Sequence, residues 1–212
     1  MRHMQAFVVS LIACGVVGVV APGSARAQEV TVPAAGPKMW VGGQVGVSPI
    51  GTFKGDSSGV SLSADTATAF EVGGRFEYQM TPLLSIGIAP AFRFNIKDKD
   101  ADESASQLDV PLRIAVGGDV ASAIRVYGFA MPGYTFLFPP KDEQGNSYNA
   151  SGFMIGFGGG VAFRVGPKFS LSGELGYQLR FPSGSVQGAG QSVDVSFQDN
   201  YLTFTVGAAA GF

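Results

Sequence analysis

Apolar residues alternate with small or polar residues throughout residues 201–212 of the chain. Successive side chains of a β-strand point to opposite faces, so one face of this segment carries Leu202, Phe204, Val206, Ala208, Ala210 and Phe212. A strand with such a face at the edge of an open sheet promotes aggregation, and closing the sheet into a barrel removes the edge. The segment is therefore predicted to be the closing strand of a β-barrel, with a terminal strand of a soluble sandwich as the alternative.

The same alternation begins at residue 38 and continues along most of the chain. It predicts seven further strands, at residues 38–48, 68–79, 84–96, 107–116, 123–137, 153–165 and 169–181. Polar segments predict long loops at residues 49–67, 97–106, 139–150 and 182–194, and short turns are predicted at residues 81–82, 117–119 and 166–168. Long and short connections alternate, which predicts an all-β fold: an eight-stranded antiparallel transmembrane up-and-down β-barrel with four long extracellular loops and three short periplasmic turns.

Alternation alone does not say which strand face lies outside, and a soluble lipocalin-like barrel would place its apolar face inward. Three features favour the membrane arrangement. Charged residues make up only 14% of the chain, aromatic residues gather at the strand ends, and opposite charges share one strand face. No run of about eighteen apolar residues is present, so membrane-spanning helices do not account for the low charge. The apolar face, which includes Ile96 and Leu175, is expected to face lipid.

The first residues have the pattern of a secretory signal peptide. Arg2 precedes an apolar run at residues 6–21, and Ala25-Arg26-Ala27 is a small-x-small cleavage motif. We expect cleavage after Ala27, which leaves a short periplasmic lead at 28–37 and a transmembrane barrel domain at 38–212, after a signal peptide at 1–27. An uncleaved anchor and a lipoprotein signal with lipidation at Cys14 are the alternatives. The apolar run continues past Cys14, which argues against lipidation.

Over residues 28–212 the chain resembles the small eight-stranded barrels of the bacterial outer membrane, of the OmpA, OmpX and OmpW type. The resemblance lies in the architecture and in the alternating last strand that ends at Phe212. It implies a location in the cell outer membrane, contact with outer-membrane lipid and lipopolysaccharide, and recognition of Phe212 by the barrel-assembly machinery. We expect a monomer. The resemblance implies no single activity, because this fold carries adhesins, structural proteins, narrow channels and lipid-modifying enzymes.

Strand parity places ten charged residues on the inward face, where we expect a lumen charge network: Glu71, Arg75, Glu77, Arg93, Asp109, Arg113, Arg125, Arg164, Glu174 and Arg180. Pairing Gln79 with Ser85 across the turn at residues 81–82 sets Glu71 opposite Arg93. Aromatic residues near strand ends are expected to form girdles at the two membrane interfaces. One girdle contains Trp40, Tyr78, Phe163, Phe169 and Phe212, and the other contains Phe70, Phe94, Phe136, Phe153 and Phe181.

Enzyme chemistry finds little support in this sequence. Without residues 1–27 the chain has 12 basic and 16 acidic residues, no histidine and no cysteine, so it lacks Ser-His and Cys-His couples. The glycine-rich run at 156–160 continues the strand alternation and opens no helix, which argues against a phosphate loop. The acidic residues at 98–102 resemble a calcium loop, but Glu103 replaces its glycine. No cofactor, metal or nucleic-acid partner is expected.

The sequence therefore favours a non-enzymatic outer-membrane barrel with a structural or surface-interaction role and a largely plugged polar lumen. Eight strands enclose a bore that side chains can fill. A narrow passive channel for small solutes is the alternative, because many inward glycines and alanines leave room in that bore.

Overall fold

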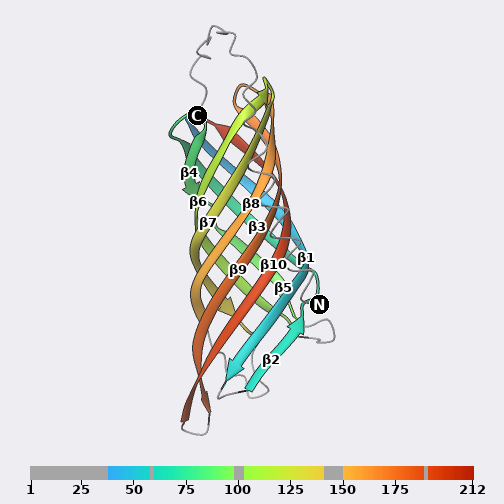
Figure 1. Ribbon diagram of the computed structural model, residues 1–212, viewed down its shortest axis with the longest axis vertical. Helices are drawn as coiled ribbons and strands as arrows, with labels where there is room; N and C mark the ends of the chain where they lie inside the picture. Colours follow the sequence, from blue (N-terminus) through green and yellow to red (C-terminus); the bar gives the residue numbers. More distant parts are fainter. Residues whose placement is uncertain (1–37, 58–59, 98–102, 141–149, 189–190) are drawn as a thin grey trace, which may run out of the picture. The chain divides into compact units, whose positions relative to one another are not determined.

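The chain was analysed as a computed structural model that describes residues 38–57, 60–97, 103–140, 150–188 and 191–212. These residues form ten strands (Figure 1): β1 (Met39–Ser57), β2 (Val60–Asp65), β3 (Ala69–Gln79), β4 (Leu84–Ile88), β5 (Ala91–Ile96), β6 (Ala105–Ala121), β7 (Ile124–Phe138), β8 (Ala150–Gly166), β9 (Phe169–Gly188) and β10 (Gln191–Gly211). Within the described residues no helix is long and apolar enough to cross a membrane. The signal peptide and lead predicted at residues 1–37 lie outside the described residues.

Antiparallel pairing closes these strands into a ring. The order is β1, β3, β4 together with β5, β6, β7, β8, β9 and β10, and β10 pairs with β1. The ring therefore has the eight predicted strands, because β4 and β5 are two parts of one strand and β2 pairs only with the far end of β1. Closure runs from the Trp40–Gly211 pair to the Ser57–Val195 pair, so the last strand closes the barrel as predicted.

The divided strand is interrupted at Ala89 and Pro90. Proline has no backbone N–H to give to a ladder, so it is confined to such breaks in a sheet. The break leaves few groups unpaired: the Pro90 carbonyl accepts from the Gly74 amide at 2.9 Å, and the Ala89 amide donates to the Pro111 carbonyl at 3.2 Å. The ring thus remains hydrogen-bonded on both sides of the proline.

The two strand faces have the polarity that the membrane arrangement requires. Outward apolar side chains are exposed, for example Val45, Val72 and Leu175, which are 51–55% exposed. Inward positions are buried and largely polar: Glu71, Arg93, Arg113, Arg180 and Thr203 are at most 4% exposed. A soluble lipocalin-like barrel has the opposite arrangement. That alternative is therefore wrong for this chain.

Two of the predicted long loops are in fact strand extensions. In residues 49–67 the chain continues β1 to Ser57 and returns as β2, and in residues 182–194 β9 continues to Gly188 and β10 begins at Gln191. β1 and β10 stay paired in these extensions, so each provides the other with ladder partners beyond the ring. The β9–β10 hairpin extends past the neighbouring strands at the lower end of Figure 1. The other two predicted loops lie between β5 and β6 and between β7 and β8, although β6 already begins at Ala105, and their central residues lie outside the described ranges.

The outward face changes from apolar to polar where the strand extensions begin. Ile50, Phe181 and Leu202 are the last outward apolar residues of their strands, and exposed Lys54, Asp56, Ser183, Ser185, Asp194 and Ser196 follow. On the opposite face of the extensions the rings of Phe53 and Phe197 lie 5.3 Å apart. The apolar band of the barrel therefore ends at the level of Ile50 and Leu202, which pair directly.

Ile96 faces inward, so its predicted outward position is wrong. Asn95 has a φ of 63°, and the register of β5 against β6 shifts between Arg93 and Ile96. This bulge adds one residue to the strand and reverses the parity after it. Ile96 is 4% exposed and packs against Ala69 and Tyr201 on the inner face.

The turn predicted at residues 117–119 is also wrong. β6 continues to Ala121 and the turn occupies residues 122–123, while Asp119 pairs with Arg125 within the ladder. Gly117 is required for a different reason: a Cβ there would lie 2.2 Å from the Val126 carbonyl oxygen. The other two short turns lie where predicted, between Gln79 and Leu84 and between Gly166 and Phe169.

The aromatic residues predicted for the girdles lie near the two strand ends. At the end with the short turns, Tyr78 pairs with Met39 and Phe163 with Ile124; at the other end, Phe70 pairs with Phe94 and Phe153 with Phe181. Most of them are outward and exposed. Trp40 also lies at the short-turn end, but its parity places it on the inward face of the barrel mouth, beside Arg75 and Ala209.

We expect Leu175→Arg to destabilise the folded barrel by about 2–4 kcal/mol, because a guanidinium at the middle of a lipid-facing strand loses its hydration. Leu175 is outward and 54% exposed. Leu175→Phe keeps this face apolar and should change stability by less than about 1 kcal/mol. Urea unfolding in liposomes measures both variants. Equal stabilities would mean that this face does not contact lipid.

Candidate functional site

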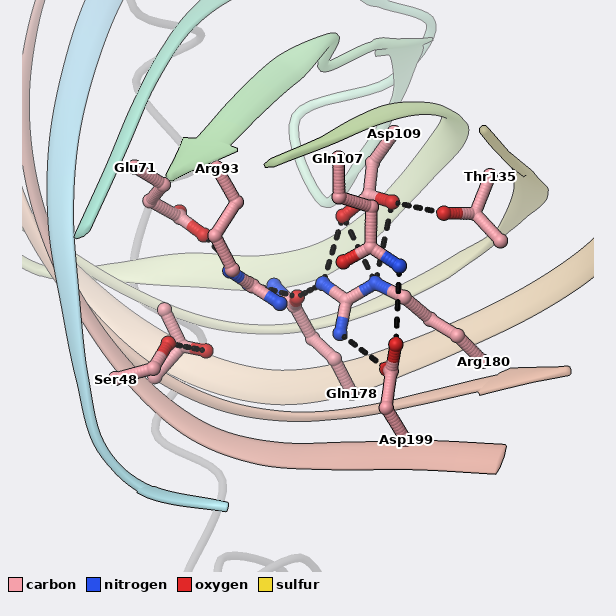
Figure 2. Close-up of polar contacts among 10 residues, drawn as sticks. Ser48, Glu71, Arg93, Gln107, Asp109, Thr135, Gln178, Arg180 and Asp199 are labelled. Carbon is pink, nitrogen blue, oxygen red and sulfur yellow. Dashed lines mark hydrogen bonds and ion pairs between the residues drawn. The ribbon is translucent and has the colours of Figure 1, made fainter. Parts of the chain in front are cut away.

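Two clusters of charged side chains fill the lumen, one above the other along the strands. We call the one nearer the long connections the loop-side cluster. It is built from six strands and consists of Glu71, Arg93, Gln107, Asp109, Thr135, Gln178, Arg180 and Asp199 (Figure 2). All eight side chains belong to buried residues.

Arg180 is the centre of the loop-side cluster. It contacts Asp109 through Nη2 at 2.6 Å and through Nε at 3.0 Å, and its Nη1 donates to Asp199 at 3.1 Å. Thr135 donates to Asp109 at 2.7 Å, and Gln107 donates to Asp199 at 3.0 Å. A guanidinium with both edges on carboxylates is the strongest pairing available to a buried arginine. Arg180 thereby joins β6, β9 and β10 across the bore.

Arg93 extends the loop-side cluster to the opposite wall. Its Nη2 donates to Glu71 Oε2 at 2.7 Å and to Gln178 Oε1 at 2.6 Å, and Gln178 also accepts from Arg180. The Arg93 guanidinium lies 4.7 Å above the centre of the Tyr201 ring. The register is the predicted one, with Gln79 opposite Ser85 and Glu71 opposite Arg93. The local hairpin geometry therefore sets this ion pair.

The second group, the turn-side cluster, consists of Arg75, Glu77, Arg113, Tyr127 and Glu174. Glu174 is its centre: Oε1 accepts from Arg75 at 2.5 Å, from Arg113 at 2.8 Å and from the Tyr127 hydroxyl at 2.6 Å. Arg113 also donates to Glu77 at 2.5 Å, and its guanidinium lies 4.3 Å from the centre of the Phe129 ring. Two arginines and two glutamates balance each other here.

Two small cavities lie beside the clusters. A cavity of about 20 Å³ lies at the level between them, lined by Gln44, Glu71, Phe129, Met131, Glu174, Gly176, Gln178, Thr203 and Thr205. A second cavity of about 70 Å³ lies at the short-turn mouth, beside Trp40 and Tyr127. One water molecule needs at least 10–15 Å³ of such space. The cavity between the clusters is therefore about the size of one water molecule.

The structure brings together eight of the ten residues of the predicted lumen network. Arg125 and Arg164 belong to neither cluster and lie at the short-turn mouth. Arg125 donates to the carbonyls of Pro82 and Leu83 at 2.9 and 3.3 Å. Arg164 forms a bidentate ion pair with Asp119, with distances of 2.9 and 3.0 Å. The Arg164–Asp119 pair is substantially exposed, with side chains 34% and 44% accessible.

Sequence reasoning missed several polar members of the two clusters. Asp199 is fully buried and bonds to Arg180, and its parity with inward Tyr201 and Thr203 in the closing strand would have identified it. Gln178 and Tyr127 also carry essential hydrogen bonds, and both lie on inward positions of their strands. Among the described residues no three acidic, histidine or cysteine side chains form a metal site, and the acidic residues at 98–102 lie outside these residues.

A closed ring of antiparallel strands, an apolar outer face and a polar, charge-paired lumen define a transmembrane β-barrel of the bacterial outer-membrane type. The family model described as "Outer membrane protein beta-barrel domain" matches residues 12–212. The chain belongs to this family, which places it in the outer membrane. No curated protein sequence matches the chain.

Solved structures with the same fold include other outer-membrane proteins. The chain is similar to the outer membrane protein OprG from Pseudomonas aeruginosa, with a TM-score of 0.61 and 16% identity over 84% of this chain and 96% of that one. It is also similar to the outer membrane protein AlkL in lipid bilayers, with a TM-score of 0.52 and 13% identity over 91% of this chain and 96% of that one. At these identities the similarity establishes the fold alone.

Removing one charge from a cluster is expected to be far more costly than removing one at the mouth. Glu174→Gln leaves Arg75 and Arg113 to share the single carboxylate of Glu77, and we expect a loss of about 3–5 kcal/mol of unfolding free energy. Asp119→Asn breaks an exposed pair and should cost less than about 1 kcal/mol. Urea unfolding in liposomes compares the two. Similar losses would show that the lumen is as well hydrated as the mouth.

Proposed function

We propose that this protein is a non-enzymatic outer-membrane barrel with a structural or surface-interaction role, and that its lumen is closed to solutes. The observation that carries the proposal is the pair of stacked clusters, in which arginines span the bore and bind carboxylates on opposite walls. Opening a path past either cluster separates buried opposite charges, which is strongly unfavourable. The surfaces left for interaction are then the outer loops and the strand extensions.

The absence of an enzymatic role in this proposal rests on residue chemistry. The barrel residues 38–212 contain no histidine or cysteine. The buried carboxylates of both clusters are held by arginines, as in Glu174 with Arg75 and Arg113. A carboxylate in such a structural ion pair is poorly placed to transfer protons to a substrate. The proposal therefore assigns these groups to closure of the lumen.

The proposal includes the steps that bring the protein to the outer membrane. The signal at residues 1–27 directs secretion across the inner membrane and is cleaved after Ala27. The barrel-assembly machinery then recognises the last strand and its terminal Phe212. Phe212 suits this role because its side chain is 71% exposed while its backbone pairs with Met39 at 2.9 Å. The assembled barrel is a monomer in contact with lipid and lipopolysaccharide.

Conductance in a planar bilayer tests the closed lumen. We expect the unmodified protein to show no steady, large conductance, and Glu174→Ala to raise the frequency or size of openings because it leaves Arg75 and Arg113 with Glu77 as their one remaining carboxylate partner among the described residues. Asp119→Ala is the matched control, since its ion pair is exposed at the mouth and should not alter conductance. Steady open currents in the unmodified protein would contradict the proposal and support a narrow passive channel for small solutes.

The proposed role of Phe212 separates into a side-chain and a backbone contribution. Phe212→Ala keeps the backbone hydrogen bonds to Met39 and Lys38, whereas deletion removes them. We expect Phe212→Ala to reduce the assembled, heat-modifiable barrel in cells while the signal peptide is still cleaved. Refolding of purified Phe212→Ala into liposomes should be unchanged. Normal assembly of Phe212→Ala in cells would remove its side chain from this role.

A further inference from the structure

Charged side chains are divided unevenly between the two ends of the barrel. Among the described residues, the half that contains the turn-side cluster and the short turns has six basic and three acidic side chains: Lys38, Arg75, Arg113, Arg125, Arg164 and Lys168 against Glu77, Asp119 and Glu174. The other half has four basic and seven acidic side chains within the described ranges. The short-turn mouth is therefore the positive end of the barrel, and such a field raises the local concentration of anions.

Arg125 is a half-buried cation of this mouth that forms no ion pair with a described carboxylate. Its Nη1 and Nη2 donate to the carbonyls of Pro82 and Leu83 at 2.9 and 3.3 Å. Its partner across the β6–β7 ladder is Asp119, but Arg164 binds both oxygens of that carboxylate. Two neutral carbonyls hold the guanidinium in place without cancelling its charge. A guanidinium has five N–H donors, so three remain for another acceptor.

Three arginines, Arg75, Arg125 and Arg164, line the cavity of about 70 Å³ at this mouth. Glu77 is the single carboxylate among the described residues that line it, and Arg113 already donates to Glu77 at 2.5 Å. Arg75 and Arg164 have carboxylate partners as well. The charge of Arg125 is therefore the one that the lining of the cavity leaves without a negative partner.

The cavity is large enough for a small polyatomic anion. One water molecule needs at least 10–15 Å³ of such space, so the cavity has room for about five, which matches the four or five non-hydrogen atoms of a phosphate or carboxylate group. The side chains of Ser85 and Ser170 also line it and add hydroxyl donors. Access from water is available at the mouth, where the Arg164 side chain is 34% exposed.

We propose that the short-turn mouth binds one small oxyanion, a phosphate or a carboxylate group, with Arg125 as the charged ligand. A planar guanidinium donates parallel N–H bonds to two oxygens of such a group, a geometry that monatomic chloride cannot use. The bound group supplies the negative charge that Arg125 lacks. The site admits a free anion or the charged end of a larger molecule, and it is reached from the side of the short turns.

Fluorescence of Trp40 tests the site, because Trp40 is the single tryptophan of the chain and lines this cavity. In detergent micelles at neutral pH, sodium chloride is replaced stepwise by sodium phosphate or by sodium acetate at constant ionic strength. We expect a saturable change. Saturation with phosphate alone assigns a phosphate group, and saturation with acetate alone assigns a carboxylate. The absence of a saturable change with both anions would overturn the proposal.

A matched pair of variants separates a built site from general attraction to the positive end. Arg125→Gln and Lys168→Gln each remove one positive charge, but Lys168 is exposed on the turn between β8 and β9 and does not line the cavity. Arg125→Gln should raise the half-saturating concentration at least about tenfold, because charge-assisted hydrogen bonds are lost. Lys168→Gln should raise it less than about twofold, because salt screens an exposed charge. Equal shifts would overturn the site.

Arg125→Lys keeps the charge and removes the planar guanidinium, so it should weaken binding several-fold. If Arg125→Gln does not fold, Arg125→Lys decides in its place, and an unchanged half-saturating concentration would overturn the role of Arg125. Phosphorus NMR of inorganic phosphate provides a second readout, in which line broadening should appear with the unmodified protein and with Lys168→Gln. These measurements do not depend on whether the lumen conducts.

Discussion

The ring of backbone hydrogen bonds is the constraint on which the rest of this barrel depends. Lipid offers no hydrogen-bond partners, so a strand can face it only if both of its edges are paired. Pairing of β10 with β1 from the Trp40–Gly211 pair onward removes the last free edges. Once the ring is closed, alternate side chains of each strand contact lipid, and the side chains between them must fill the bore. Even the proline break in the third strand preserves the ring, because the Pro90 carbonyl still accepts from Gly74.

The filled bore explains why the inward face carries so many charges. If the inward face were also apolar, the two faces of each strand would be alike, and the sequence would not specify which face contacts lipid. Arginine is suited to this position because its long side chain spans the bore and its planar head binds two carboxylates at once, as Arg180 does with Asp109 and Asp199. Aromatic rings complete the packing around these heads, as Tyr201 does for Arg93 and Phe129 for Arg113. In the proposed function such networks close the lumen, and they make the stability of the barrel sensitive to the loss of any single partner.

The strand extensions separate the part of the barrel in lipid from the part in water. Along β1 and β10 the ladder is continuous, but the outward residues change from apolar Ile50 and Leu202 to polar Thr52, Lys54 and Gln198. The same pairing that closes the barrel in the membrane thus supports a sheet beyond it. In the proposed function, this sheet and the loops are the surfaces available for interaction outside the membrane.

The sequence by itself determined the strand number, the inward and outward residues of most strands and the Glu71–Arg93 pair, because alternation and hairpin register are local properties of the chain. Only the tertiary structure decided which residues form each cluster: Glu174 meets Arg75 and Arg113 from positions 99 and 61 residues away. Those contacts depend on how far neighbouring strands are staggered around the closed ring. The ring likewise decided the strand extensions at residues 49–67 and 182–194, since polar segments become strands where a paired neighbour supplies the hydrogen bonds. The inward turn of Ile96 follows from a bulge, which a period of two residues cannot reveal.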